Sequence, residues 1–296
     1  MMRFVVLLAA VIAACPQTAN AAPVPAAAVT DPPRDPAHPA YNRQLLIPSA
    51  GVGMNALLFA AAGVGPKPTM ILMHGLPGNE RNLDLAQAVR RAGWNVLTFT
   101  YRGAWGSPGN FSIRGAVDDT AAALAFARSP DGVKLGIDPN RLVLAGHSMG
   151  AMAAMLTAAN QPRVTGLVIL DAWDAGKDSA AIRKGGAEAR AGAVRSMDDL
   201  GHALQGATAE SLVDELIAKG SDLDLLATAP KLNGRRILSV YARYGGAADN
   251  RALAAELRRN HARLTAVELV SDHSFADHRI ALAVAVVAWL QRLPGR

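Results

Sequence analysis

The 296-residue chain is poor in cysteine, in aromatic residues and in charge. Its only cysteine is Cys15, so the chain cannot form an internal disulfide, and a core of this size does not need one. Aromatic residues make up 5% and charged residues 18%, and the basic residues occur in short pairs rather than in a run. These shortages exclude stacking platforms for single strands and a basic binding stripe. We therefore expect a globular protein with no nucleic-acid partner.

A run long enough to span a bilayer is also missing. The N-terminal apolar stretch, Phe4–Ala14, follows a positively charged start and is too short to cross a membrane comfortably. Residues 19–21, "ANA", fit a small-x-small cleavage site, so residues 1–21 are predicted to be a bacterial export signal peptide. Ile12–Cys15 also resembles a lipoprotein box. The expectation is a periplasmic or secreted protein, which contacts a membrane only if Cys15 is lipidated.

A proline-rich segment separates this leader from the folded domain. Residues 22–40 contain six prolines and are predicted to be an extended tether, and the domain of residues 41–296 follows. Continuous apolar runs such as Met70–Met73 indicate strands buried on both faces, and they alternate with helical patterns. The alternation predicts an α/β fold whose mostly parallel sheet is covered by helices on both faces. Strands are expected at 45–47, 56–60, 70–73, 96–101, 142–145, 167–170, 237–241 and 267–270, and helices at 83–92, 116–128, 149–159, 251–263 and 277–293.

One long region interrupts the alternation. No convincing strand pattern occurs between Asp171 and Pro230, whereas helical patches such as Ala209–Lys219 do occur. A structureless connection of this length is uncommon in a compact domain. We interpret residues 172–230, approximately, as a helical cap inserted over a site.

The motif Gly146-His147-Ser148-Met149-Gly150 follows the strand pattern of residues 142–145 and precedes a helix pattern. A serine between two glycines at a strand-to-helix junction is typical of a nucleophile elbow, in which a strained turn presents the hydroxyl. The alternative is a chance pattern in a glycine-rich chain. The context favours Ser148 as a catalytic nucleophile.

A serine nucleophile needs a base at the end of a later strand. Four histidines follow Ser148 in the chain, and His273 lies three residues beyond the strand predicted at 267–270. His278 stands where the last helix is expected to begin, so we interpret it as a helix-start residue and keep it as the reserve base. The other two, His202 and His261, lie in the predicted cap and near a helix end.

The acid of the triad is assigned from the loop after the strand at 237–241. Asp249 is the only carboxylate in that loop, and the predicted helix and strand after it return His273 to its side. A purely structural alternative is that Asp249 caps the next helix. Asp171, at the end of the preceding strand, is the alternative acid, and Asp272 is a weaker candidate.

Two backbone amides are predicted to form the oxyanion hole. One belongs to Met149, directly after the nucleophile, and the other to Leu76 in the loop "HGLPGN", where Gly75 permits a close turn. His74 and His147 are interpreted as structural neighbours rather than bases. Arg102 is predicted to fasten its own loop, and Asp118 and Asp119 to complement a helix dipole.

The order HGLPGN, YRGAWGSPG, GHSMG, a late aspartate and DHSF resembles the α/β-hydrolase superfamily over roughly residues 41–293. Within it, the chain is similar to the serine aminopeptidase and acyl-peptidase-like esterase branch. The resemblance implies an α/β-hydrolase fold with an eight-stranded sheet. It also implies Ser148, Asp249 and His273 as the triad.

The resulting expectation is an exported serine hydrolase, with no cofactor and no metal, whose substrate is a small ester or a short peptide. Esters are the first expectation, and aminopeptidase or acyl-peptide hydrolysis is the alternative. A peptidase that binds a free amino terminus would need a buried carboxylate near the site. The cap offers Asp174, Asp178, Glu188, Asp198 and Asp199. A non-catalytic exported binding protein on the same fold is the alternative of another class.

Overall fold

The structure is a computed structural model that describes residues 23–294. The predicted signal peptide and Cys15 lie outside the described residues. Within the described part, no helix has the length and apolar character needed to cross a membrane.

A single eight-stranded sheet forms the centre of the molecule, with the order β1-β2-β4-β3-β5-β6-β7-β8. The first two strands pair antiparallel, β2 pairs antiparallel with β4, and all the remaining pairs are parallel. This sheet confirms the fold class predicted from the sequence. Its strands are β1 (Tyr41–Ser49), β2 (Val52–Ala60), β3 (Lys67–Met73), β4 (Asn95–Phe99), β5 (Ile137–His147), β6 (Gly166–Leu170), β7 (Arg236–Ala242) and β8 (Arg263–Leu269).

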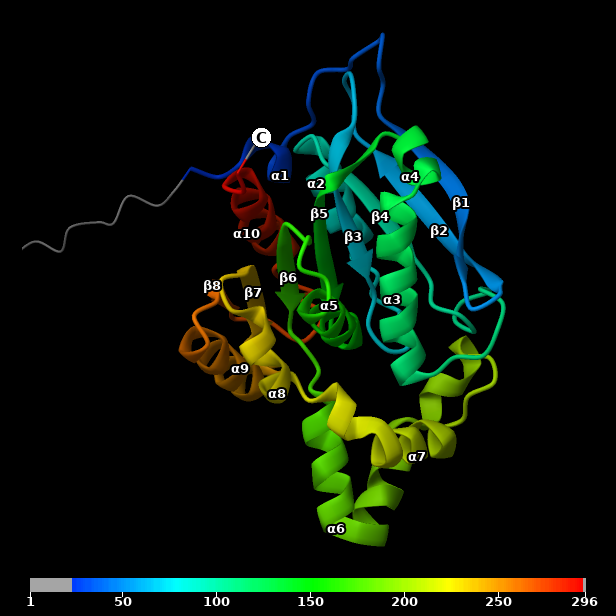
Figure 1. The fold of residues 1–296 in the computed structure, drawn as a ribbon. Helices are drawn as coiled ribbons and strands as arrows, with labels where there is room; N and C mark the ends of the chain where they lie inside the picture. Colours follow the sequence, from blue (N-terminus) through cyan, green and yellow to red (C-terminus); the bar gives the residue numbers. More distant parts are fainter. Residues whose placement is uncertain (1–22, 295–296) are drawn as a thin grey trace, which may run out of the picture.

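The central strands have no polar face because helices cover both sides of the sheet. One buried cluster packs α3 (Ile113–Arg128), α5 (Met149–Ala159) and α9 (Ala247–Arg259) on one face, and a second packs α2 (Leu83–Arg91) and α10 (Arg279–Gln291) on the other. Figure 1 shows α3 and α5 in front of the strands. A short helix, α4 (Pro130–Lys134), follows α3 and was not predicted.

The proline-rich segment differs from the extended tether expected from its sequence. Its Ala26–Val29 stretch forms α1, which contacts α2 and α10, and Arg91 donates to the carbonyl of Ala27 over 2.8 Å. The alanines between the flanking prolines supply helix-forming residues with small side chains, which lets this turn pack closely. The first strand of the sheet, β1, begins at Tyr41.

The region after β6 is helical, as predicted, and Figure 1 places α6 and α7 beyond the end of the sheet toward which the parallel strands point. Its elements are α6 (Ala175–Ser196), η1 (Asp198–Ala203), α7 (Ala209–Lys219), η2 (Gly220–Leu223), α8 (Leu225–Thr228) and η3 (Ala229–Leu232). Several contacts fasten it to the core, and two of them lie near α3 and the loop after β4. Glu215 accepts hydrogen bonds from the first amides of α3, and Ala104 forms a bridge with Leu204.

Candidate active site

Ser148 stands at the sharp junction between β5 and α5. Its backbone adopts φ 56° and ψ −119°, a conformation that L-residues rarely adopt, and its amide donates to the carbonyl of Leu170 on β6 over 2.9 Å. Strained backbone of this kind persists only where the surroundings hold it, and it is common at functional sites. The geometry is that of the nucleophile elbow predicted from the sequence.

The glycines on either side of Ser148 are required by close backbone approach. A Cβ on Gly146 would lie 2.1 Å from the carbonyl oxygen of Gly150, and a Cβ on Gly150 would lie 2.5 Å from the carbonyl oxygen of His74. Neither position has room for a side chain. The two glycines therefore permit the tight turn that presents Ser148.

His273 lies in the loop after β8, as predicted, and it is paired with Asp171. Its Nδ1 atom is 2.6 Å from Oδ2 of Asp171, which directly follows β6. Because a carboxylate accepts, we assign the Nδ1 proton to the histidine donor. That tautomer leaves Nε2 of His273 free to act as a base.

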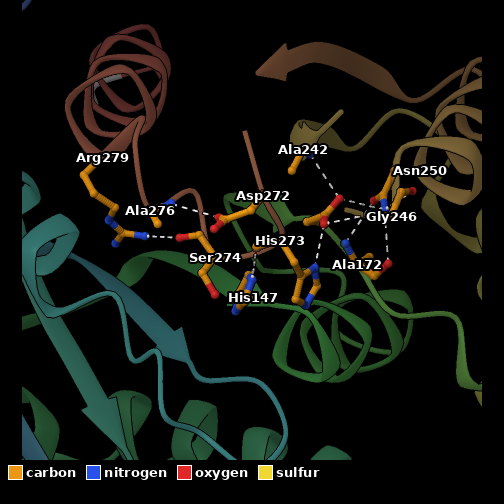
Figure 2. A network of polar contacts seen from close by, with 11 residues as sticks. His147, Ala172, Ala242, Gly246, Asn250, Asp272, His273, Ser274, Ala276 and Arg279 are labelled. Carbon is orange, nitrogen blue, oxygen red and sulfur yellow. Dashed lines mark hydrogen bonds and ion pairs between the residues drawn. The ribbon is translucent and has the colours of Figure 1, made fainter. Parts of the chain in front are cut away.

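The Asp171 carboxylate is fully buried and receives donors from the β7–α9 loop. The amide of Gly246 donates to Oδ2 over 2.9 Å, and the amide of Ala242 and the side-chain amide of Asn250 donate to Oδ1 over 3.2 and 3.3 Å. Figure 2 shows His273 pointing toward the carboxylate that these groups surround. Buried charge is costly unless it is hydrogen-bonded, and this pocket supplies the bonds.

Asp249 is not beside His273, which corrects the prediction from the sequence. The loop after β7 is shorter than expected because α9 begins at Ala247, so Asp249 falls in the first turn of the helix. Its carboxylate is partly exposed and forms an ion pair with Lys177 of the cap helix α6. The alternative acid, Asp171, occupies the position beside the base.

The sequence reasoning missed two residues that hold Asp171. Asn250 donates to the Asp171 carboxylate and accepts from the amide of Ala172 over 3.0 Å. Gly245 packs against the same group, because a Cβ there would lie 2.3 Å from Oδ2 of Asp171. The adjacent glycines, Gly245 and Gly246, were the available signal, since close approach to a buried group is one reason for glycine in a loop.

His147 connects the elbow to the base. Its Nε2 atom lies 2.8 Å from the carbonyl oxygen of His273, and the two ring centroids are 4.6 Å apart. Since a carbonyl accepts, Nε2 of His147 must carry the proton. Burial, together with the smaller effect of the nearby His273, lowers the pKa of His147 to about 4. His147 is thus a neutral residue that fixes the position of the His273 backbone, in agreement with the structural role predicted for it.

His74 is also structural, as predicted. It is buried, its Nδ1 lies 2.7 Å from the carbonyl oxygen of Gly75, and burial lowers its pKa to about 4. Its own carbonyl accepts from the hydroxyl of Tyr101 over 3.0 Å. These contacts hold the loop that begins at His74.

The loop after β3 brings the predicted oxyanion donors toward Ser148. A Cβ on Gly75 would lie 3.0 Å from Cβ of Ser148, so the chain passes directly beside the nucleophile. Among the described residues, the amides of Leu76 and Met149 donate to no other group, and the Ser148 hydroxyl has no hydrogen-bond partner. Catalytic hydrogen bonds to the nucleophile are often long without substrate. The arrangement leaves two donors available to a developing oxyanion.

The remaining residues that were considered for the site make contacts away from the His273–Asp171 pair. Arg102 donates to Asp119 over 2.5 Å, and Asp119 is buried in the second turn of α3, so it holds the loop rather than complementing the helix dipole. His278 precedes α10 and contacts Asp277 over 3.0 Å, away from Asp171. Asp272 accepts from the amide of Ala276 over 2.9 Å (Figure 2).

The cap carboxylates are engaged or exposed. Asp174 is buried and accepts from the amide of Lys177 over 3.1 Å at the start of α6. Asp178 is exposed and accepts from the indole of Trp173 over 2.6 Å. The other three, Glu188, Asp198 and Asp199, are exposed. In residues 23–294 no group of three or more His, Cys, Asp or Glu side chains is arranged to hold a metal ion.

Comparison with known proteins identifies the family and the fold. Residues 70–286 match the model of the alpha/beta hydrolase family. Among solved structures, the thermophilic carboxylesterase EstE1 from a metagenomic library aligns with a TM-score of 0.63 at 20% identity, over 91% of this chain and 92% of its own. An esterase from Pyrobaculum calidifontis aligns with a TM-score of 0.64 at 16% identity, over 86% and 87% of the two chains. At these identities the likeness shows the fold.

Similarity to curated proteins is confined to shorter segments. The quorum-quenching protein AidA of Acinetobacter baumannii is 34% identical over 126 residues, which are 40% of this chain and 40% of that protein. An sn-1-specific diacylglycerol lipase of Mus musculus is 37% identical over 109 residues, 35% of this chain and 32% of the lipase. The chain thus matches well under half the length of these relatives.

Proposed function

Because the chain belongs to the alpha/beta hydrolase family, we propose that it is a serine hydrolase that cleaves carboxylic esters through an acyl-enzyme. The observation that carries the proposal is the 2.6 Å contact between Nδ1 of His273 and the buried Asp171. The ring of His273 lies 4.6 Å from that of His147, the residue directly before the strained Ser148. A histidine oriented in this way is a base, and a serine hydroxyl needs one. The triad proposed here is Ser148, His273 and Asp171.

In the first half of the reaction, Nε2 of His273 takes the proton of Ser148 as Oγ attacks the ester carbonyl. The carbonyl oxygen becomes an oxyanion, which the amides of Leu76 and Met149 stabilise. The imidazolium is stabilised by the Asp171 carboxylate, which the amide of Gly246 and its neighbours hold in place. His273 then gives the proton to the alcohol oxygen as the ester C–O bond breaks.

In the second half, a water molecule attacks the acyl-enzyme carbonyl. His273 takes a proton from that water and returns it to Oγ of Ser148 as the acyl bond breaks, so the products are a carboxylic acid and an alcohol. Every proton taken is returned. The cycle needs no cofactor.

Esters are favoured over peptides with a free amino terminus by the state of the cap. The buried cap carboxylate, Asp174, already caps α6, and Asp178 is exposed and bonded to Trp173. Neither is a free buried anion suited to an ammonium group. Esterases and a lipase among the similar proteins support the same choice. Aminopeptidase or acyl-peptide hydrolysis, the finer assignment within the family, is the second candidate.

Export is part of the proposal. The positively charged start, the 11-residue apolar stretch Phe4–Ala14 and the "ANA" site support a periplasmic or secreted enzyme. The cysteine at position 15 supports lipid anchoring as the variant of that proposal. Mass spectrometry of the mature N-terminus separates cleavage after Ala21 from lipidation of Cys15.

The central test is active-site labelling. A fluorophosphonate probe should label the purified protein, and Ser148→Ala should abolish the labelling, with Ser274→Ala as the matched control that stays labelled. A panel of nitrophenyl esters and aminoacyl anilides then separates ester from peptide hydrolysis. Labelling that persists in Ser148→Ala would refute the nucleophile, and an intact protein that neither reacts nor hydrolyses any substrate would favour the binding protein.

A further inference from the structure

A cavity of about 580 Å³ lies on the α2 side of the sheet, outside the proposed triad and oxyanion hole. Its floor comes from β1, β2 and β4, and its wall from Arg81 before α2, from Leu83 at the start of α2 and from the loop after β4. Figure 1 shows these three strands together at one side of the sheet. A volume of this order is typical of a site for a small ligand.

Among residues 23–294, Arg81 is the only charged residue that lines this cavity. Its guanidinium lies 4.7 Å from the ring centroid of Trp105, and its Nε donates to the carbonyl of Gly78 over 3.2 Å. Arg81 is half-buried, and desolvation lowers its pKa. Within residues 23–294 its two Nη groups have no hydrogen-bond or ion-pair partner. A partly desolvated cation without a counter-ion is a site for an anion.

The carboxylates nearest to Arg81 in the chain are bound elsewhere. Asp84 pairs with Arg279 of α10 over 2.5 Å, and Glu80 lies 3.7 Å from the same guanidinium. The hydrogen bond from Arg279 lowers the pKa of Asp84 against the opposing effect of burial. Arg279 thus pairs with both acids, and neither of them lies within ion-pair distance of Arg81.

The other lining residues select an apolar body with one charge. Leu46, Leu83 and Trp105 are exposed apolar side chains at this cavity, and Gln44 and Asn55 add neutral amides. A dianion would leave one charge without a partner beside apolar walls, which is costly. A single carboxylate satisfies Arg81, and an alkyl or aryl chain covers the exposed apolar surface.

We propose that this cavity binds an amphipathic monocarboxylic acid, with its carboxylate on Arg81 and its apolar chain along Leu46, Leu83 and Trp105. The site is separate from Ser148. Two residues that line it, Trp105 and Arg81, donate hydrogen bonds to the carbonyls of Pro77 and Gly78. Pro77 and Gly78 follow Leu76 in the loop beside the nucleophile. A ligand there therefore contacts two side chains that are hydrogen-bonded to that loop.

The test measures binding directly in the Ser148→Ala background, so its outcome is independent of hydrolysis. Isothermal titration with decanoate, below its micelle concentration, should give one saturable site. Arg81→Gln should weaken that binding at least tenfold, whereas Arg81→Lys keeps the charge and most of the affinity. Arg90→Gln, which removes another half-buried arginine of the same region, should leave binding unchanged.

Two further arms test the geometry. Leu46→Glu places a competing carboxylate at an exposed position of the cavity and should also weaken decanoate binding. Thermal melting of each variant checks that it is folded. Inorganic phosphate should not displace decanoate, and decanol should bind more weakly. The proposal would be overturned if the Ser148→Ala protein bound decanoate with the same affinity whether it carried Arg81, Arg81→Lys or Arg81→Gln. Displacement of decanoate by phosphate would overturn it as well.

Discussion

Two aspartates, Asp171 and Asp249, follow neighbouring strands of the same sheet and meet opposite environments. Asp171 follows β6, is fully buried and has four hydrogen-bond partners, including His273. Asp249 follows β7 by seven positions, is partly exposed and has one exposed ion-pair partner, Lys177. A carboxylate can orient and stabilise an imidazolium only where it is held and shielded from water. The difference shows that burial and donor supply select the acid.

The largest expected effect comes from exchanging each aspartate for asparagine. Asp171→Asn should lower kcat for a nitrophenyl ester by about 10⁴-fold, because an amide cannot hold the proton of His273 on Nδ1. Asp249→Asn should change kcat by less than about twofold, since an exposed ion pair contributes little. Steady-state kinetics on both variants decides the matter, and the reverse ranking would restore Asp249 as the acid.

A smaller effect is expected from displacing Asp171 without changing its chemistry. In Gly245→Ala the new Cβ would lie 2.3 Å from Oδ2 of Asp171, so the carboxylate must move. A shift of about 1 Å in a catalytic group can cost about 100-fold in rate. Gly192→Ala is the matched control, because a Cβ there meets only the end of Arg195 at 3.8 Å. Equal kcat values for the two variants would show that Asp171 does not need this position.

The buried histidines near Asp171 and the elbow predict that the free energy of unfolding depends on pH. The pKa values of His74 and His147 are lowered to about 4, so the unfolded chain binds these protons at a higher pH than the folded protein does. The contribution of these neutral histidines to the free energy of unfolding is complete above about pH 6.5. It is lost as the pH falls toward 4, and the loss is at most about 3 kcal/mol for each histidine. Urea denaturation between pH 4 and 7 measures this slope.

His147→Gln should reduce that slope, because glutamine cannot titrate. The control is His38→Gln, since His38 is exposed and should leave the slope unchanged. A slope that is identical in all three proteins would mean that the buried histidines do not titrate as described.

The smallest effect is expected from removing the exposed ion pair of Asp249. Lys177→Ala removes the partner of Asp249, and the exposed pair should contribute less than about 1 kcal/mol to the free energy of unfolding. Urea denaturation in low and high salt measures it. A loss of several kcal/mol would mean that Asp249 is held as firmly as Asp171.

Much of the fold could be predicted from the sequence. Runs such as Met70–Met73 and the helix Met149–Ala159 were placed correctly, because strands buried on both faces and small helix-forming residues leave clear patterns. The boundaries were less accurate. The helix predicted at 251–263 begins instead at Ala247, and residue 263 opens β8. That shift of four residues moved Asp249 from a loop onto a helix.

The sequence by itself determined the elbow around Ser148 and the loop position of His273, because both follow from local strand and turn patterns. Only the tertiary structure decided the acid. Asp171 and His273 are 102 residues apart in the chain, and the donors for Asp171 come from the loop after a third strand. Which carboxylate becomes buried among those donors depends on the pairing of β6 with β7 and of β7 with β8, and no local pattern records that pairing.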